Sequence, residues 1–158
     1  MTKHLTILLS LLTIFSCSEH TVTLTDTERN EIAGSVRLTL NNYYSDIKNG
    51  GLTAEFKYLD SSADFFWVPP GYSHSISYDS VATVLRQNAP KYKLIENSFD
   101  TLQIITLTNH IATYSARLRS QMTDTAGNVT AFSLVETGVL IKRKDGWKLL
   151  SGQTSIID

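Results

Sequence analysis

The stretch TGVLIKRKDGWKLLSGQTS, residues 137–155, decides the fold of this chain. It predicts two strands joined by a tight turn, because Asp145-Gly146 favours a two-residue hairpin turn with positive φ. Val139 and Ile141 fall on one face of the first strand. One face of the second strand is expected to carry Trp147, Leu149, Ser151, Gln153 and Ser155. Since an isolated hairpin is at best marginally stable in water, a larger sheet and a cover for its apolar side must exist upstream.

The composition is that of one ordinary globular domain behind a short leader. The chain has 158 residues, of which 42% are hydrophobic and 18% are charged, and its formal net charge is -1. Nothing in this balance favours nucleic acid or a strongly charged partner. After processing of the leader only His20, His74 and His110 remain, without metal-binding spacing, so neither a metal nor another cofactor is expected.

Residues 1–17 are typical of an export signal. Lys3 and His4 precede a nearly unbroken apolar run, residues 5–15, which is too short for a membrane-spanning helix. Ile14-Phe15-Ser16-Cys17 resembles a bacterial lipobox, and this resemblance implies cleavage before Cys17 and lipid attachment to it. The alternative is an ordinary signal peptide in which the cysteine has no such role.

The expected organisation is a lipoprotein signal peptide at 1–17, a tether at 18–24 and a folded domain at 25–158. The protein would then be exported and anchored to a bacterial membrane through lipidated Cys17, with the outer membrane, on its periplasmic or surface face, as the expected destination.

Helical patterns occupy the first half of the domain. Thr25 and Glu28 form a capping-box pattern, and the apolar spacing that follows predicts a helix over 26–48. A short helix is expected over 52–59, because Leu52, Phe56 and Leu59 recur at helical spacing. An aromatic strand, 65–68, and a third helix that opens at 77–80 complete this half.

Strand patterns occupy the second half, with candidates at 92–99, 102–108, 110–122, 129–142 and 147–157. Helices followed by a long antiparallel meander indicate the α+β class, with the N-terminal helices packed on one face of a strongly curved antiparallel sheet. Such an arrangement encloses a concave pocket.

This order and four motifs resemble the NTF2-like superfamily, and most closely its SnoaL-like or DUF4440-type branch. The motifs are the first helix ending in Tyr43-Tyr44-Ser45, the segment FFWVPPG at 65–71, the two long strands, and the closing DGWKLLSGQTS at 145–155. The resemblance implies a cone-shaped α+β barrel that is often a homodimer through its sheet. It does not fix an activity, because this fold carries isomerases, dehydratases, cyclases, transport factors and binding domains.

The same resemblance suggests catalytic candidates, since ketosteroid-isomerase-like relatives use a carboxylate base and a tyrosine-containing oxyanion hole. Tyr43 or Tyr44 would supply the phenol, and Asp64, Asp79 or Glu136 the carboxylate. Many relatives carry histidine at the place of Gln153, and glutamine cannot act as an acid or base near neutral pH.

Glu136 is the strongest carboxylate candidate, because it shares a strand face with Leu134 and Leu140. Burial there would raise its pKa toward the range of a general base. The alternative is that this face meets solvent or a partner subunit, with Glu136 paired to Arg117 or Arg119.

Aromatic side chains predict a pocket for a flat apolar ligand. The predicted lining residues are Tyr44, Phe56, Phe66, Trp67, Tyr78, Tyr114 and Gln153, together with the candidate catalytic residues Tyr43, Asp64 and Glu136. Three functions stay open. The first is a lipid-anchored domain that binds a small apolar ligand or a protein partner. The alternative is an isomerase or dehydratase that uses a pocket carboxylate and a tyrosine. The third is a domain that acts mainly as a dimerising module.

Overall fold

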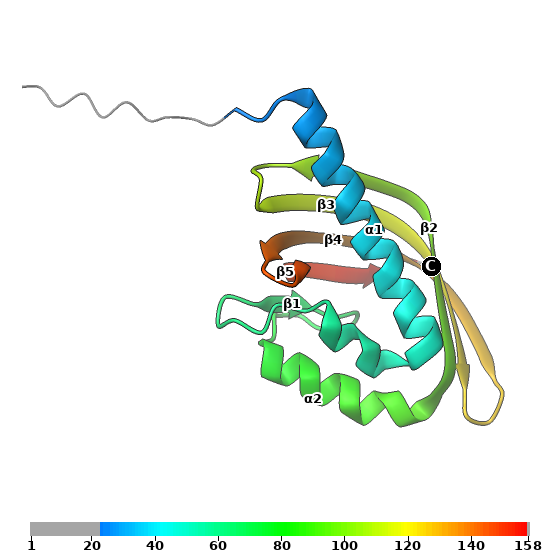
Figure 1. The fold of residues 1–158 in the computed structure, drawn as a ribbon. Coiled ribbons are helices and arrows are strands. Elements are labelled where there is room, and N and C mark those ends of the chain that lie inside the picture. Colours follow the sequence, from blue (N-terminus) through cyan, green and yellow to red (C-terminus); the bar gives the residue numbers. More distant parts are fainter. Residues whose placement is uncertain (1–22, 158) are drawn as a thin grey trace, which may run out of the picture.

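The computed structural model describes residues 23–157 as helices packed on a five-stranded curved sheet (Figure 1). In chain order the α-helices, 3-10 helices (η) and strands are α1 (Asp26–Gly50), η1 (Leu52–Lys57), β1 (Phe66–Val68), α2 (Tyr78–Asn88), η2 (Ala89–Lys91), β2 (Tyr92–Thr106), β3 (Ile111–Asp124), β4 (Val129–Arg143) and β5 (Gly146–Ile156). The α+β class and the cone-like arrangement predicted from the sequence are confirmed.

Helix α1 begins at the predicted capping box. The Thr25 hydroxyl accepts a hydrogen bond from the Glu28 amide, and the Glu28 carboxylate accepts one from the Thr25 amide at 2.8 Å. The helix ends before Gly51, whose φ of 75° lies in the region that glycine tolerates. Its apolar side buries Val36, Leu40, Tyr43, Tyr44 and Ile47. The predicted helix is therefore confirmed, and it runs two residues further than expected.

The sheet has the strand order β1-β5-β4-β3-β2. The four long strands pair in antiparallel fashion, whereas β1 pairs with β5 in parallel. The sheet is therefore mixed, and not antiparallel throughout as predicted. Figure 1 shows that the long strands bend strongly and that α1 crosses their concave side, with α2 beside β1 at the far end.

Two irregularities in strand pairing change the predicted strand pattern. The segments 92–99 and 102–108 form one strand, β2, whose register shifts between Phe99 and Thr101. In β5, Leu149 pairs with Leu140 but Ser151 pairs with Val139, so Leu150 is an extra residue in a bulge. The prediction that one face runs from Trp147 through Gln153 to Ser155 is therefore wrong, because one extra residue exchanges the two faces.

The predicted hairpin forms between β4 and β5, with a different turn from the one expected. Arg143 pairs with Gly146, so Lys144 and Asp145 are the central residues. Gly146 has a φ of 117°, and no non-glycine residue among residues 23–157 has a positive φ. The expectation of positive φ at Asp145 is thus wrong.

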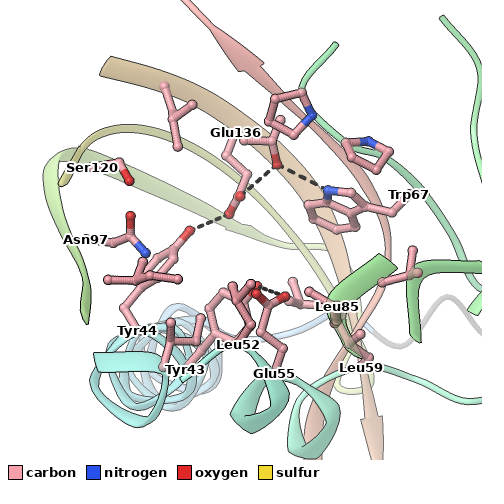
Figure 2. A pocket seen from close by; sticks show the side chains of 18 of the residues that line it. Tyr43, Tyr44, Leu52, Glu55, Leu59, Trp67, Leu85, Asn97, Ser120 and Glu136 are labelled. Carbon is pink, nitrogen blue, oxygen red and sulfur yellow. Dashed lines mark hydrogen bonds between the residues drawn. The ribbon is translucent and has the colours of Figure 1, made fainter. Parts of the chain in front are cut away.

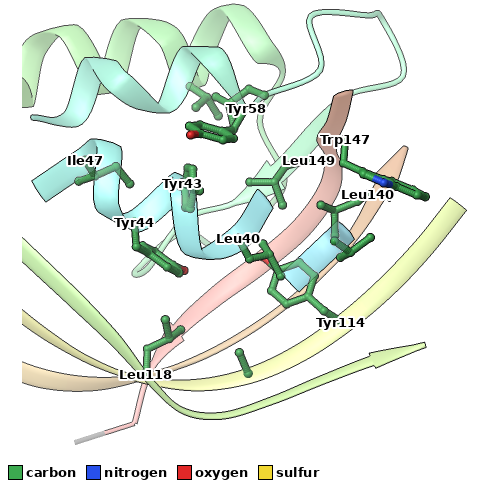
Figure 3. Close-up of a cluster of buried hydrophobic side chains, with 14 of the residues drawn as sticks. Leu40, Tyr43, Tyr44, Ile47, Tyr58, Tyr114, Leu118, Leu140, Trp147 and Leu149 are labelled. Carbon is green, nitrogen blue, oxygen red and sulfur yellow. The ribbon is translucent and has the colours of Figure 1, made fainter. Parts of the chain in front are cut away.

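The core lies between α1 and the concave face of the sheet (Figure 3). Leu40 of α1, Leu118 of β3 and Leu140 of β4 are completely buried there. Trp147 and Leu149, the first inward residues of β5, belong to this core. Where η1 and α2 face the sheet, side chains leave a cavity, which Leu149 also lines.

Candidate functional site

An internal cavity of about 180 Å³ opens between the helices and the concave face of the sheet (Figure 2). Most of its wall is apolar, from residues of η1, α2 and the strands, including Leu52, Leu59, Phe65, Val81, Leu85 and Ile95. Eight side chains with polar atoms interrupt this wall, namely Tyr43, Tyr44, Glu55, Trp67, Asn97, Ser120, Glu136 and Thr154.

Glu136 lies at the middle of β4 with 6% of its surface exposed. Its Oε1 accepts hydrogen bonds from the hydroxyls of Tyr44 at 2.8 Å and Tyr114 at 2.6 Å, and its Oε2 accepts one from Thr154 at 2.9 Å. Burial raises the pKa of Glu136, and these three donors oppose the rise. The predicted apolar face around Glu136 is confirmed.

The alternative pairing of Glu136 with an arginine is wrong. Arg119 lies 2.7 Å from Asp100, and Arg117 lies 4.0 Å from the same carboxylate. Both arginine side chains are largely exposed, whereas Glu136 faces inward from the neighbouring strand.

Trp67 extends the hydrogen-bond chain of Glu136. Its indole Nε1 donates to the Thr154 hydroxyl at 3.1 Å, and that hydroxyl donates to Glu136. The ring rests on two paired glycines, Gly138 and Gly152, because a Cβ at Gly152 would lie 2.6 Å from the indole and one at Gly138 would lie 3.2 Å from it. Because glycine has no side chain, Gly138 and Gly152 leave room for this large ring to form part of the cavity wall.

Glu55 is a second carboxyl group in the cavity, and the sequence analysis missed it. The Tyr43 hydroxyl donates to its Oε2 at 2.8 Å, and Oε1 has no hydrogen-bond partner within residues 23–157. Burial raises the pKa of Glu55 to about 7; the Tyr43 hydroxyl acts against this, and the charge of Glu136 adds to it. Glu55 is therefore the carboxyl group best suited to exchange a proton near neutral pH.

Glu55 could not be predicted from α-helical spacing, because it lies in the short 3-10 helix η1. With three residues per turn, positions i and i+3 share a side, so Glu55 follows Leu52 into the cavity. The predicted α-helical spacing would have placed Phe56 there instead. That threefold spacing is the feature of the sequence that could have identified Glu55.

Asn97 and Ser120 form a further polar point on the wall. They lie directly opposite each other on β2 and β3. Only 2% of the Ser120 surface is exposed, and its hydroxyl has no hydrogen-bond partner within residues 23–157. A buried hydroxyl beside an internal cavity without a partner is costly unless a bound molecule satisfies it.

Of the predicted site residues, the structure brings Tyr43, Tyr44, Trp67 and Glu136 together at the cavity. Tyr114 is buried behind the wall, where its hydroxyl reaches Glu136. These contacts place the predicted carboxylate beside the predicted phenols.

The other predicted residues lie elsewhere. Asp64 is exposed in the loop before β1, and Asp79 is exposed at the start of α2. Phe66 is 49% exposed, because it points away from its neighbour Trp67. Gln153 is exposed and pairs with Thr137, since the bulge at Leu150 turns Thr154 into the cavity in its place.

Phe56 and Tyr78 border a separate surface depression near Asp60 and Arg143. The Arg86 guanidinium lies 4.9 Å from the centre of the Phe56 ring. These two aromatic side chains therefore do not contribute to the internal cavity.

Within residues 23–157, no group of three or more His, Cys, Asp or Glu side chains is arranged to hold a metal ion. In the same part of the chain, no helix is both long and apolar enough to cross a membrane. The predicted lipidation site, Cys17, and the predicted leader lie outside the described residues.

Helices on a curved mixed sheet around an internal cavity define the NTF2-like α+β fold. A family model for the SnoaL-like domain matches residues 36–158, and the chain belongs to this family. No curated protein matches the sequence.

Solved structures share the fold at low sequence identity. An NTF2-like superfamily protein from Salmonella enterica serovar Typhimurium is 13% identical with a TM-score of 0.69, over 82% of this chain and 93% of that one. A candidate dehydratase of the NTF2-like family from Streptomyces avermitilis is 18% identical with a TM-score of 0.69, over 82% and 99%. A hexachlorocyclohexane dehydrochlorinase (LinA, type 2) is 12% identical with a TM-score of 0.67, over 85% and 90%.

Proposed function

We propose that this protein binds a small, mainly apolar molecule with at least one polar group in the internal cavity. The observation that carries the proposal is the unpartnered hydroxyl of Ser120 in a mainly apolar wall. A cavity of about 150 Å³ accommodates benzene. A cavity of about 180 Å³ therefore has room for one six-membered ring with a short substituent.

Filling the cavity tests this proposal. Val84 lines the cavity from α2, so Val84→Phe should occupy the space and abolish binding of a ring probe such as 2-phenylethanol. Thr83→Phe adds the same ring at the exposed neighbouring position and should leave binding unchanged. Thermal-shift and calorimetric titrations measure both, and equal binding by the two variants would contradict the proposal. Native mass spectrometry of the purified protein would show any co-purified ligand.

Proton transfer on the bound molecule is the second candidate function, and Glu55 favours it. The Glu136 oxygens already accept three hydroxyl hydrogen bonds, whereas Glu55 has a free oxygen and a pKa of about 7. An isomerase or dehydratase reaction would then use Glu55 as base, in place of the predicted Glu136 and Asp64, and the unpartnered Ser120 hydroxyl as hydrogen-bond donor, because the Tyr44 hydroxyl already donates to Glu136. The dehydrochlorinase and the candidate dehydratase with this fold are compatible with such chemistry.

Hydrogen–deuterium exchange tests this candidate without knowledge of the natural substrate. Cyclohex-2-enone in D2O should exchange the hydrogens on the carbons activated by its carbonyl when the protein is present, as followed by NMR. Glu55→Gln should retain binding of the ketone and lose the exchange. Unchanged exchange by the variant would remove Glu55 from this role.

We propose, from the sequence, that the domain is exported and lipid-anchored at Cys17. Cys17→Ala should move the protein from the membrane fraction to the soluble fraction of the producing cells.

We also propose a homodimer through the sheet, which the exposed apolar residues Phe66 and Ile105 on its outer side support. A monomer in native mass spectrometry would contradict the dimer, and a protein partner on this face would appear as a stable second component.

A further inference from the structure

We infer that the preferred ligand of the cavity is a small organic cation, a protonated amine carried on an apolar ring. This inference rests on the proposed function, because it assumes that the cavity is a ligand site. It follows from the charges and the aromatic rings that line the wall, because they favour a positively charged group on the ligand over a neutral or negative one.

The charged groups on the wall are all of one kind. Glu55 of η1 and Glu136 of β4 face the cavity, and among residues 23–157 no lysine, arginine or histidine lines it. An anionic ligand would therefore enter an apolar space without any counter-charge and next to two carboxyl groups, which is strongly unfavourable. A cation meets the opposite situation, since Glu55 can accept its hydrogen bond and Glu136 adds a second negative charge nearby.

Aromatic rings provide a second attraction for a cation. Tyr43, Tyr44, Phe65 and Trp67 all line the cavity, and the rings of Tyr43 and Tyr44 are 4.8 Å apart, centre to centre. Figure 2 shows the neighbouring rings of Tyr43 and Tyr44 on the cavity wall, the first hydrogen-bonded to Glu55 and the second to Glu136. The negative faces of aromatic rings attract ammonium groups, most strongly where water is excluded. A neutral ring would satisfy the apolar wall and leave the carboxyl groups without a counter-charge.

The two carboxyl groups disfavour each other's charge when the cavity holds no cation. Burial raises the pKa of Glu55 to about 7, and the charge of Glu136 contributes to the rise. Besides Glu136, the titratable groups that face Glu55 are the Tyr43 and Tyr44 phenols of α1. The residues of α2, β1, β2, β3 and β5 that line the cavity carry no charge. A cation between the carboxyl groups would remove this repulsion and stabilise the ionised form of Glu55.

Binding of a cation should therefore release a proton. With a pKa of about 7, roughly half of the Glu55 side chains are protonated at pH 7, about nine in ten at pH 6 and about one in ten at pH 8. If the ionised form is the one that binds, the apparent affinity rises with its population, by about tenfold from pH 6 to pH 8. A neutral ligand has no such dependence.

The test compares phenethylammonium with 2-phenylethanol, two probes of the same size that differ in the charge of one group. Calorimetric titration of the purified protein at pH 8 should give at least about tenfold tighter binding of phenethylammonium, the value of one charge-assisted hydrogen bond. At pH 7, titrations in two buffers of different ionisation enthalpy should give different apparent enthalpies for phenethylammonium only, because a proton leaves Glu55.

Glu55→Gln separates charge from shape. It should weaken phenethylammonium by about tenfold at pH 8 and abolish proton release, and leave 2-phenylethanol within about twofold. Glu31→Gln, the same change on the exposed side of α1, should alter neither probe.

Equal or tighter binding of 2-phenylethanol would overturn the cation inference and support the proposed cavity function. Absence of binding by both probes would overturn both. Tight binding of phenethylammonium that Glu55→Gln does not weaken would also contradict the inference, because the charge would then act elsewhere.

Discussion

Glu55→Gln should make the protein more stable at pH 8 and leave its stability at pH 4 unchanged. The pKa of Glu55 rises from its ordinary value of 4.5 to about 7 on folding. A carboxyl group with a raised pKa binds its proton more tightly in the folded state. The folded state is therefore penalised progressively as pH increases from about 4.5 to about 7, and the penalty is complete above both values.

The magnitude follows from that difference. Each tenfold change in proton affinity corresponds to about 1.4 kcal/mol, so the rise from 4.5 to about 7 costs the folded state about 3 kcal/mol at pH 8. Glutamine has nearly the same shape, carries no charge and can still accept the Tyr43 hydrogen bond. The variant should therefore gain about 3 kcal/mol at pH 8, or roughly 10 °C in Tm for a domain of this size.

Urea unfolding of the wild type and the variant at pH 4 and pH 8 measures the effect directly. Subtracting the free energies of unfolding of the two proteins removes the contributions of other groups that titrate in this range. Glu31→Gln, on the exposed face of α1, serves as the matched control and should show no pH-dependent difference. If Glu55→Gln differed from wild type by the same amount at both pH values, or were less stable at pH 8, the argument that desolvation of the half-buried Glu55 raises its pKa to about 7 would be refuted.

Tyr114→Phe should destabilise the protein by about 2 kcal/mol in urea unfolding at pH 7, because it removes a 2.6 Å hydrogen bond to the buried Glu136 carboxyl. Gly152→Ala should cost about 3 kcal/mol and change the tryptophan fluorescence, since its Cβ would lie 2.6 Å from the Trp67 ring. Although burial acts in the opposite direction, hydrogen bonds from neighbouring groups lower the pKa of Asp60 from 3.8 to about 2. Asp60→Asn should therefore cost about 2 kcal/mol at pH 7, an effect that unfolding measurements should lose between about pH 4 and pH 2.

Matched variants distinguish these effects from general damage. Tyr72→Phe removes a hydroxyl from an exposed ring and should leave stability within about 0.5 kcal/mol. Gly34→Ala, where a Cβ meets no atom within 4 Å inside α1, should stabilise by up to about 1 kcal/mol. A Gly152→Ala variant as stable as Gly34→Ala would contradict the close packing under Trp67.

Features fixed by local chemistry could be predicted from the sequence. The Thr25–Glu28 capping box located the start of α1, because its two hydrogen bonds need only residues within one turn. The alternation around Glu136 placed this carboxyl on a buried face, since the strand is regular over that stretch. Such predictions succeed where the contacts join residues close in sequence and where the alternation of side chains along a strand is not interrupted.

Features that depend on pairing between distant segments could not be predicted in this way. The bulge at Leu150 arises from the register between β4 and β5, and it exchanged Gln153 for Thr154 at the cavity. Glu55 entered the site through a 3-10 turn, whose threefold spacing a helical interpretation of 52–59 does not contain. The lack of a hydrogen-bond partner for Ser120 could not be predicted, because it depends on the positions of side chains from distant segments.

The parallel pairing of β1 with β5 has a consequence for the order of folding. Phe66, Trp67 and Val68 pair with Ser151, Gly152 and Gln153, so the chain between the partners must be in place before they can meet. Contacts of such long sequence separation are slow to form, because the intervening loop must close first. During synthesis, the support beneath Trp67 would be absent until Gly152 has left the ribosome. The internal cavity is therefore expected to be among the last parts of the domain to mature, after α1 and the β2–β3–β4 meander.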